Sequence, residues 1–148
     1  MTYYLSLGSN LGEREQNLRR ALQSIGQQVG SITRCSSFYY SEPWGFHSAN
    51  GFCNLCCAVE SDLPPMDVLA ATQSIERAMG RTHKTIDRHY TDRLIDIDLI
   101  RAIDSNGEEV CLKREEMVNG QIVNILTLPH PLYREREFVT VPLAEITA

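Results

Sequence analysis

Two aspartates separated by a single residue carry the strongest chemical signal in this sequence. Asp96 and Asp98 lie inside an apolar run, Leu94 to Ile100, that follows Arg93. Such a run predicts a β-strand, and the two-residue period of a strand places both carboxylates on one face. Two carboxylates this close repel each other unless a cation neutralises them or one binds a proton. The pair therefore suggests a site for a hard divalent cation such as Mg2+, and an exposed acidic edge strand is the simpler alternative.

A basic stretch leads into this pair. Residues 77–93 contain five arginines and lysines against two aspartates, a local charge of +3 in a chain whose formal net charge is −5. Positive charge beside an acidic pair suggests a polyphosphate held together with its metal, although a solvated polar loop explains the charge equally well. The negative net charge argues against general nucleic-acid binding.

The length of the chain indicates one domain. A single hydrophobic core can organise 148 residues, so we expect one domain over residues 1–148. No apolar stretch approaches the roughly eighteen residues of a membrane span, and the first residues lack the basic and apolar regions of a secretory signal. These features predict a cytoplasmic protein without a membrane partner.

Five cysteines are present, and an odd number does not suggest a disulfide framework. Cys53 and Cys56 have the spacing of a redox or metal motif. They lie in the strand-like segment Phe52–Glu60, however, where the strand period places them on opposite faces. Buried, reduced thiols are therefore the favoured interpretation.

Apolar periodicity predicts an alternation of strands and helices. The first predicted strand, Tyr3–Leu7, ends at the turn Gly8–Gly12. This turn resembles a phosphate-binding loop, but no lysine follows it, so a tight connection to a helix is favoured. Asn10 and Glu13 have the spacing of a capping box at the start of that helix.

Two further strands are expected at Ile32–Tyr40 and Phe52–Glu60, and a second helix is expected between Pro64 and Gly80. The strand with the two aspartates follows, and Asn-Gly pairs predict one or two hairpins between Glu108 and Leu128. The order βαββαβ indicates an α+β fold, a ferredoxin-like sandwich with its helices on one face of the sheet and extra hairpin strands toward the C-terminus. Residues 139–146 are expected to complete the core.

Several polar residues in these elements need partners. Asn54 falls on an otherwise apolar strand face, where either the neighbouring backbone or a ligand must supply its hydrogen bonds. The segment from Ser41 to Gly51 is long for a hairpin and contains aromatic residues, which is typical of a binding loop. Gln73 and Glu76 share a helix face, and their spacing alone favours an ordinary solvated pair.

Four segments, taken together, resemble the 6-hydroxymethyl-7,8-dihydropterin pyrophosphokinase family. They are Leu5–Gly12, the aromatic loop with Asn54, Arg93–Ile100, and the region from Leu126–Pro131 to Phe138–Leu143. Their order matches the family along nearly the whole chain. The resemblance implies transfer of diphosphate from ATP to the hydroxymethyl group of the pterin, with release of AMP and with two Mg2+ ions as cofactors.

The resemblance also implies roles for individual residues. Asp96 and Asp98 match the positions that bind both metal ions, and Arg81 and Arg93 match positions that act with them in catalysis. The positions that contact ATP are Gln73, Glu76, Arg81, Arg93, Thr127, His130 and Arg136. Those that contact the pterin are Ser41, Trp44, Phe52, Asn54 and Phe138, with the two phenylalanines stacked on either side of the ring. The loops at residues 41–51 and 81–92 are expected to close over both substrates.

Two other classes of protein are compatible with the same pattern. One is a ferredoxin-like regulatory domain that binds a small ligand without chemistry, and the other is a metal-dependent nucleotidyltransferase. A binding domain has no evident use for paired aspartates beside arginines. The expected partners are the small molecules ATP and hydroxymethyldihydropterin, not nucleic acid or membrane, and we expect a monomer or a weak homo-oligomer.

Overall fold

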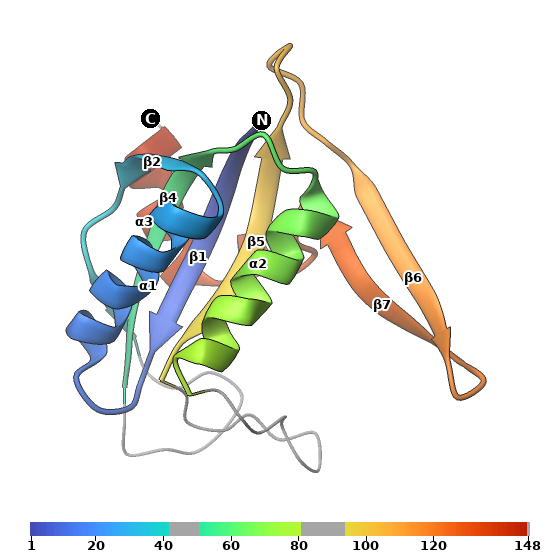
Figure 1. Ribbon diagram of the computed structural model, residues 1–148. Helices are drawn as coiled ribbons and strands as arrows, with labels where there is room; N and C mark the ends of the chain where they lie inside the picture. The colour runs from blue at the N-terminus through green and yellow to red at the C-terminus, as the bar shows by residue number, and fades with distance from the viewer. Residues whose placement is uncertain (42–50, 81–93, 148) are drawn as a thin grey trace.

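The described part of the chain comprises residues 1–41, 51–80 and 94–147 of a computed structural model (Figure 1). Trp44, Arg81 and Arg93, together with most of both predicted substrate loops, lie outside these residues. Within the described ranges, no helix is long and apolar enough to cross a membrane.

Five strands form the main antiparallel sheet. They are β1 (Thr2–Ser9), β2 (Ser31–Cys35), β3 (Tyr39–Ser41), β4 (Phe52–Glu60) and β5 (Asp96–Ile103). The order across the sheet is β2-β4-β1-β5, and the short β3 also pairs with β4. With helices connecting β1 to β2 and β4 to β5, this is the ferredoxin-like arrangement, so the predicted α+β fold class is confirmed.

The predicted strand Ile32–Tyr40 is in fact two strands. Between them, the N–H of Ser36 donates to the carbonyl oxygen of Cys56 over 2.9 Å, and the Oγ of Ser36 accepts the N–H of Cys56 over 2.9 Å. The serine hydroxyl replaces a backbone acceptor of the ladder. The chain can therefore leave the regular strand without leaving a buried N–H unpaired.

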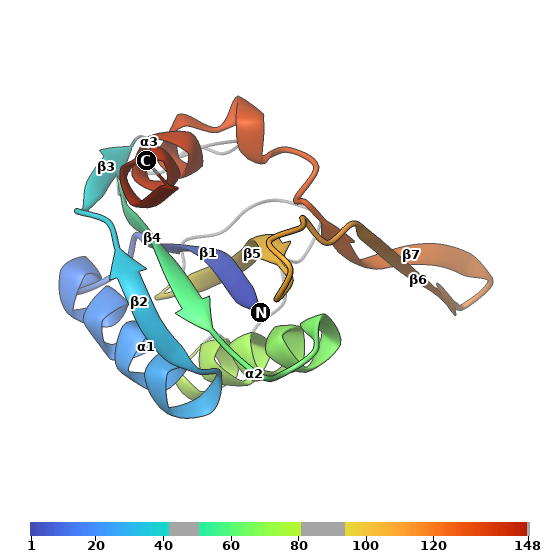
Figure 2. The same ribbon diagram turned by 90° about the horizontal axis from the view of Figure 1, so that it is seen from above.

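Helices α1 (Arg14–Gln28) and α2 (Pro65–Ala78) cover one face of the sheet, as Figure 2 shows from above. Their apolar side chains join the buried strand residues in one core; these include Leu18, Ala21, Ile25, Val68 and Ile75. Proline at the first turn of α2 and Gly80 just beyond its end match the predicted limits. Gly80 has a φ of +106°, a conformation that glycine adopts without strain.

The start of α1 differs from the prediction. The helix begins at Arg14, and its N-cap residue, Glu13, makes no side-chain capping bond. Asn10 lies before the helix and is buried, so the expected capping box does not form. Asn17 stabilises the turn instead, because its Nδ2 donates to Ser9 Oγ over 3.2 Å and to a carbonyl oxygen of the turn over 2.9 Å.

A third helix, α3 (Glu137–Thr147), lies on the opposite face of the sheet (Figure 2), which corrects the expectation of helices on one face only. A short 3-10 turn, η2 (Tyr133–Glu135), precedes it. Buried residues of α3 pack in a second core with sheet residues; this core contains Cys56, Ala58, Ile100, Tyr133, Val139, Leu143 and Ile146. Residues 139–146 thus complete the core, as expected, but on the second face.

Two more strands, β6 (Leu112–Val118) and β7 (Gln121–Leu128), form a separate hairpin that projects from the body (Figure 1). We call this hairpin the arm. At its tip, Asn119 and Gly120 have φ values of 52° and 78°. Two consecutive positive φ values are what a type I′ hairpin turn requires, so the hairpin predicted from the Asn-Gly pair is confirmed.

The cysteines of β4 illustrate how the strand separates the two cores. Cys53 and Cys57 belong to the core under α1 and α2, whereas Cys56 packs against α3. Cys53 and Cys56 therefore lie on opposite faces, as predicted, and all five cysteines are free thiols. Burial raises the pKa of Cys56 to about 12, so this thiol is neutral and unreactive near neutral pH.

Candidate active site

Asp96 and Asp98 lie at the start of β5, which is an edge strand of the described sheet. Ile97 and Leu99 are buried in the core with α1 and α2. Strand alternation therefore directs both aspartates to the other face, as the sequence spacing predicts. Both are partly exposed, so they are accessible to a ligand.

The register of β1 connects two parts of the predicted site. Gly8 of β1 pairs with Asn54 on β4 and with Asp96 on β5. On the same face, Ser6 pairs with Asp98. Because neighbouring strands are about 4.8 Å apart, the backbones at Asn54 and Asp96 lie about 10 Å from each other. The amide predicted to bind the pterin and a carboxylate predicted to bind metal therefore flank the same glycine.

A pocket of about 380 Å³ lies along the edge of β5 and is lined by Asp96 and Asp98. Every described residue that was predicted to contact ATP also lines it, namely Gln73, Glu76, Thr127, His130 and Arg136. These residues come from α2, from the end of β7 and from the segment before α3. The fold thus brings together side chains that are far apart in the sequence.

Glu76 differs from the expectation of a solvated pair. Gln73 is exposed, but Glu76 is 6% exposed, and its Oε2 accepts the N–H of Ile97 over 2.8 Å. Ile97 is the residue between the two aspartates, and an edge strand presents such N–H groups with no ladder partner. A charge-assisted bond to a carboxylate is stronger than one to a neutral acceptor. Glu76 therefore fixes the peptide that carries the aspartate pair.

The imidazole of His130 is held in one orientation. Its Nδ1 accepts the N–H of Leu132 over 3.2 Å, and the backbone N–H of His130 donates to the carbonyl oxygen of Ile100 over 2.8 Å. Because Nδ1 is an acceptor here, the neutral ring carries its proton on Nε2. Burial, and then the positive charge of Arg136, lower the pKa of His130, against a smaller opposing effect of Asp96. The ring is therefore a neutral Nε2–H donor near pH 7.

Arg136 and Phe138 connect the pocket to the start of α3. The guanidinium carbon of Arg136 lies 5.8 Å from the centroid of the Phe138 ring, a distance at which a cation and an aromatic face attract each other. Phe138 is partly buried against the second core. Arg136, predicted to contact ATP, and Phe138, predicted to contact the pterin, are thus neighbours.

Asn54 finds its partners in the surrounding chain. It is 3% exposed, and its Nδ2 donates to the carbonyl oxygen of Tyr39 over 3.2 Å and to Ser41 Oγ over 2.9 Å. A Cβ atom built on Gly8 would lie 2.8 Å from Asn54 Oδ1 and 3.4 Å from the ring of Phe52. The absence of a side chain at Gly8 therefore leaves room for both residues predicted to bind the pterin.

Two contributors to this region were not identified from the sequence. The sequence indicates Gly8 as part of a turn in the family-like segment Leu5–Gly12, but its position between Asn54 and Asp96 depends on strand pairing. Arg14 belongs to no motif in the sequence; its Nη1 donates to the carbonyl oxygen of Gly51 over 2.8 Å, immediately before β4. No local sequence pattern reports a side-chain contact across such a separation.

Comparison with known proteins identifies the family to which this chain is similar. Residues 4–148 match the model of the family described as 7,8-dihydro-6-hydroxymethylpterin-pyrophosphokinase (HPPK). A 2-amino-4-hydroxy-6-hydroxymethyldihydropteridine pyrophosphokinase from Porphyromonas gingivalis is 42% identical over 143 residues, which are 97% of this chain and 88% of the relative. The enzyme of the same name from Bacillus subtilis is 33% identical over 144 residues, 97% of this chain and 76% of the relative.

The chain belongs to the HPPK family. Among solved structures, an HPPK-DHPS in complex with substrates superposes with a TM-score of 0.64 at 13% identity, over 98% of this chain and 40% of that one. At this identity the likeness bears on the fold alone, and it agrees with the ferredoxin-like topology. This pyrophosphokinase therefore combines a family match along almost its whole length with the fold predicted for the family.

Proposed function

We propose that this pyrophosphokinase transfers diphosphate from ATP to the hydroxymethyl group of 6-hydroxymethyl-7,8-dihydropterin and releases AMP, at the face that carries Asn54, Gly8 and Asp96. The strand register is the observation that supports this most directly. It places the backbones of Asn54 and Asp96 about 10 Å apart, on either side of Gly8. A pterin held at Asn54 therefore presents its substituent toward the residues that line the ATP pocket.

Asp96 and Asp98 are proposed to hold two Mg2+ ions. The donor set fits this ion, because both side chains offer carboxylate oxygens on one face of a pocket, and Mg2+ is usually bound by one or two carboxylates together with substrate phosphates. The described residues contain no group of three or more His, Cys, Asp or Glu side chains that could hold a metal by itself. Bound Mg2+ would supply charge neutralisation and alignment at the phosphates. Glu76 contributes by fixing the peptide between the two aspartates.

The remaining residues of the pocket are proposed to bind ATP. The Nε2–H of His130 and the guanidinium of Arg136 are donors suited to phosphate oxygens, and arginine keeps its charge at all relevant pH values. Thr127, whose Oγ1 donates to Asn124 Oδ1 over 3.0 Å, and Gln73 line the same pocket. Arg81 and Arg93 complete this set on the basis of the family resemblance.

The pterin is proposed to bind between Phe52 and Phe138, with Asn54 reading its polar edge. Aromatic rings stack on a pterin in an offset geometry. Because Ser41 and a backbone carbonyl hold the NH2 group of Asn54, the amide is oriented before the substrate arrives. A site of this kind discriminates against rings that lack the matching polar groups, since the amide would lose a partner. Trp44 joins this set from the resemblance.

The test is the identity of the products. The protein is incubated with ATP, Mg2+ and 6-hydroxymethyl-7,8-dihydropterin, and nucleotides and pterins are separated by chromatography. We expect AMP and a diphosphorylated pterin in equal amounts. ADP would indicate ordinary kinase chemistry, free pyrophosphate would indicate nucleotidyl transfer, and no turnover would indicate a binding domain.

We further propose that residues 1–148 act as one cytoplasmic domain whose substrates are these two small molecules. The sheet, its two cores and the pocket draw on segments from both ends of the chain. Limited proteolysis that released an active fragment lacking β7 and α3 would contradict a single functional unit.

A further inference from the structure

The arm carries apolar surface that the rest of the described chain does not cover. Six of the seven residues of β6 are exposed, and so are the first four of β7. Met117 and Ile122, which face each other across the hairpin, are 68% and 69% exposed, and Val118 is 45% exposed. An isolated two-stranded hairpin is marginally stable in water. The arm thus has the character of an interaction surface.

The free edge of this surface belongs to β6. In the described chain β6 pairs only with β7, and Figure 1 shows β7 running between β6 and the body. The register of the hairpin skips Ile125, since Arg114 pairs with Leu126 and Glu115 with Asn124. The bulge is therefore in β7, and the outer edge of β6 is a regular strand over its whole length. A regular, unpaired edge is a template for another strand.

The charges along β6 indicate which strand would pair with this edge. The sequence Leu112–Val118 places two basic residues before two acidic ones. Consider two copies of the strand that pair antiparallel about a two-fold axis normal to the sheet. The rotation leaves each side chain on the same side of the sheet. Opposite residues of the two copies must therefore be an even number of positions apart in the sequence, because side chains alternate between the two sides. A register centred on Glu115 places Arg114 opposite Glu116 of the other copy, twice. It also places Leu112 opposite Val118 and Lys113 opposite Met117, each pair twice.

The centre of this register needs separate consideration because Glu115 meets its own copy there. Lys113 Nζ already lies 3.1 Å from Glu115 Oε1 within one strand. In the pairing, the Lys113 of the second copy is the diagonal neighbour of the first copy's Glu115, within reach of a long side chain. Two lysines then compensate two glutamates. A register centred on Arg114 would also form two opposite-charge pairs, Lys113 with Glu115, but it is worse because it sets Leu112 against Glu116 and loses the contact between Leu112 and Val118.

We propose that this chain forms a two-fold symmetric dimer in which the β6 strands of two copies pair antiparallel, centred on Glu115. The two arms then make one four-stranded sheet, and each free edge of β6 gains a ladder partner. The ion pairs between Arg114 and Glu116 set the register. The contact uses none of the residues assigned above to substrates or metal.

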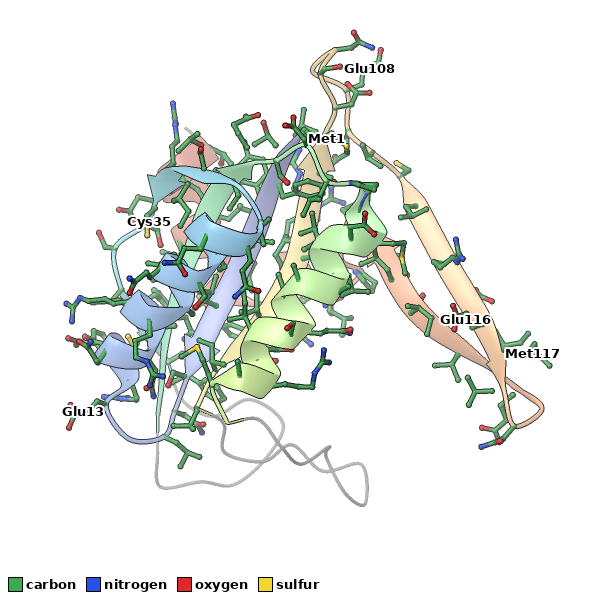
Figure 3. All side chains as sticks on the ribbon, viewed as in Figure 1. Met1, Glu13, Cys35, Glu108, Glu116 and Met117 are labelled. Carbon is green, nitrogen blue, oxygen red and sulfur yellow. The ribbon has the colours of Figure 1, made fainter. Side chains whose placement is uncertain are left out.

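Charge reversal tests both the contact and its register. The dissociation constant of the full-length protein is measured by sedimentation equilibrium from low micromolar to submillimolar concentration. Glu116→Lys and Arg114→Glu each turn two attractive cross-strand pairs into repulsive ones, so we expect the constant to rise by at least about tenfold in each variant. Figure 3 shows Glu108 on a separate turn, away from Glu116 and Met117 on the arm. Glu108→Lys, an equal charge change at an exposed site, should leave the constant unchanged.

Recombination of the charges makes the test specific. An equimolar mixture of Glu116→Lys and Arg114→Glu should form a dimer containing one copy of each, and the double variant should dimerise like the unaltered chain, because both restore opposite charges at every pair. A thermal melt of each variant checks that the fold is intact. A monomer at all concentrations, or dimerisation of Glu116→Lys equal to that of the unaltered chain, overturns the proposal. Failure of the mixture and the double variant to associate overturns the register.

Discussion

The two faces of the central sheet contain side chains of different kinds, although the same strands supply both. On the face covered by α1 and α2, residues such as Leu5, Val59 and Leu99 form a continuous buried core. On the other face, α3 covers only one region, and the positions near the ends of β1 and β5 carry Gly8 and Asp96 instead. Strand alternation is what assigns each residue to one face or the other.

This difference separates stability from chemistry. Burial of apolar surface is the main stabilising contribution to folding, and most of it lies under α1 and α2. The opposite face retains polar side chains that cost stability unless a partner compensates them. Substitutions under α1 and α2 should therefore lower stability more than activity, whereas substitutions of the polar residues on the opposite face should lower activity more than stability.

The largest expected effect on activity comes from Asp96→Asn and Asp98→Asn. Each variant should lower kcat/KM by at least about a thousandfold, roughly 4 kcal/mol, because a proposed Mg2+ ligand is lost. The thermal melt of the metal-free protein should be unchanged or higher, since two neighbouring carboxylates repel. Asp62→Asn, at an exposed site remote from the pocket, is the control. Near-normal turnover in either variant would remove the metal assignment.

A comparable effect, but on stability, is expected from Leu5→Ala on the covered face. Leu5 is 0% exposed, and truncating a buried leucine costs about 2–5 kcal/mol of unfolding free energy. Urea denaturation measures this loss. At low temperature the folded fraction should retain its kcat/KM. A loss of kcat/KM in fully folded protein would show that the two faces are not independent.

A smaller effect, confined to one substrate, is expected from Asn54→Ala. Loss of a buried amide that is oriented by Ser41 should weaken pterin binding by about 1–3 kcal/mol, and leave ATP binding nearly unchanged. Isothermal titration with each substrate separates these effects. Asn106→Ala, on an exposed turn, serves as the matched control. Equal losses for both substrates would instead indicate that Asn54 maintains the sheet.

The smallest expected effect concerns His130 and pH. Its folded-state pKa lies below the ordinary value of 6.5 because of burial and Arg136. The folded state therefore binds fewer protons than the unfolded state, so this contribution to stability is complete above pH 6.5 and is lost as the pH falls toward the folded-state pKa. Denaturation of metal-free protein as a function of pH should show a shallower acid decline for His130→Gln. An identical decline would contradict the lowered pKa.

The sequence was sufficient for the fold class and for the position of the aspartate pair, because strand period and helix period are local properties. The limits of β4 follow from the alternation of its residues, and those of α2 follow from Pro65 and Gly80, which are local signals as well. The break at Ser36 was not predictable, since it depends on a hydrogen bond to Cys56 on another strand. The placement of α3 on the second face likewise depends on packing that no local pattern records.

The resemblance predicted which described residues line the pocket, but the contacts that hold them in place were not predictable. Local spacing favoured a solvated Glu76, whereas the structure buries it against the peptide of Ile97. The tautomer of His130 depends on the N–H of Leu132, and the roles of Gly8 and Arg14 depend on strand pairing and a distant carbonyl. Each of these facts concerns a contact between segments that are separated in the chain or a backbone geometry that sequence patterns do not specify.

Gly8 has a consequence for how this site can change in evolution. Any side chain at position 8 would meet the amide of Asn54 and the ring of Phe52. The Asn54 amide is held by Tyr39 and Ser41, so it could yield to a side chain at position 8 only by disturbing those hydrogen bonds. Substitutions at positions 8 and 54 should therefore be correlated among relatives.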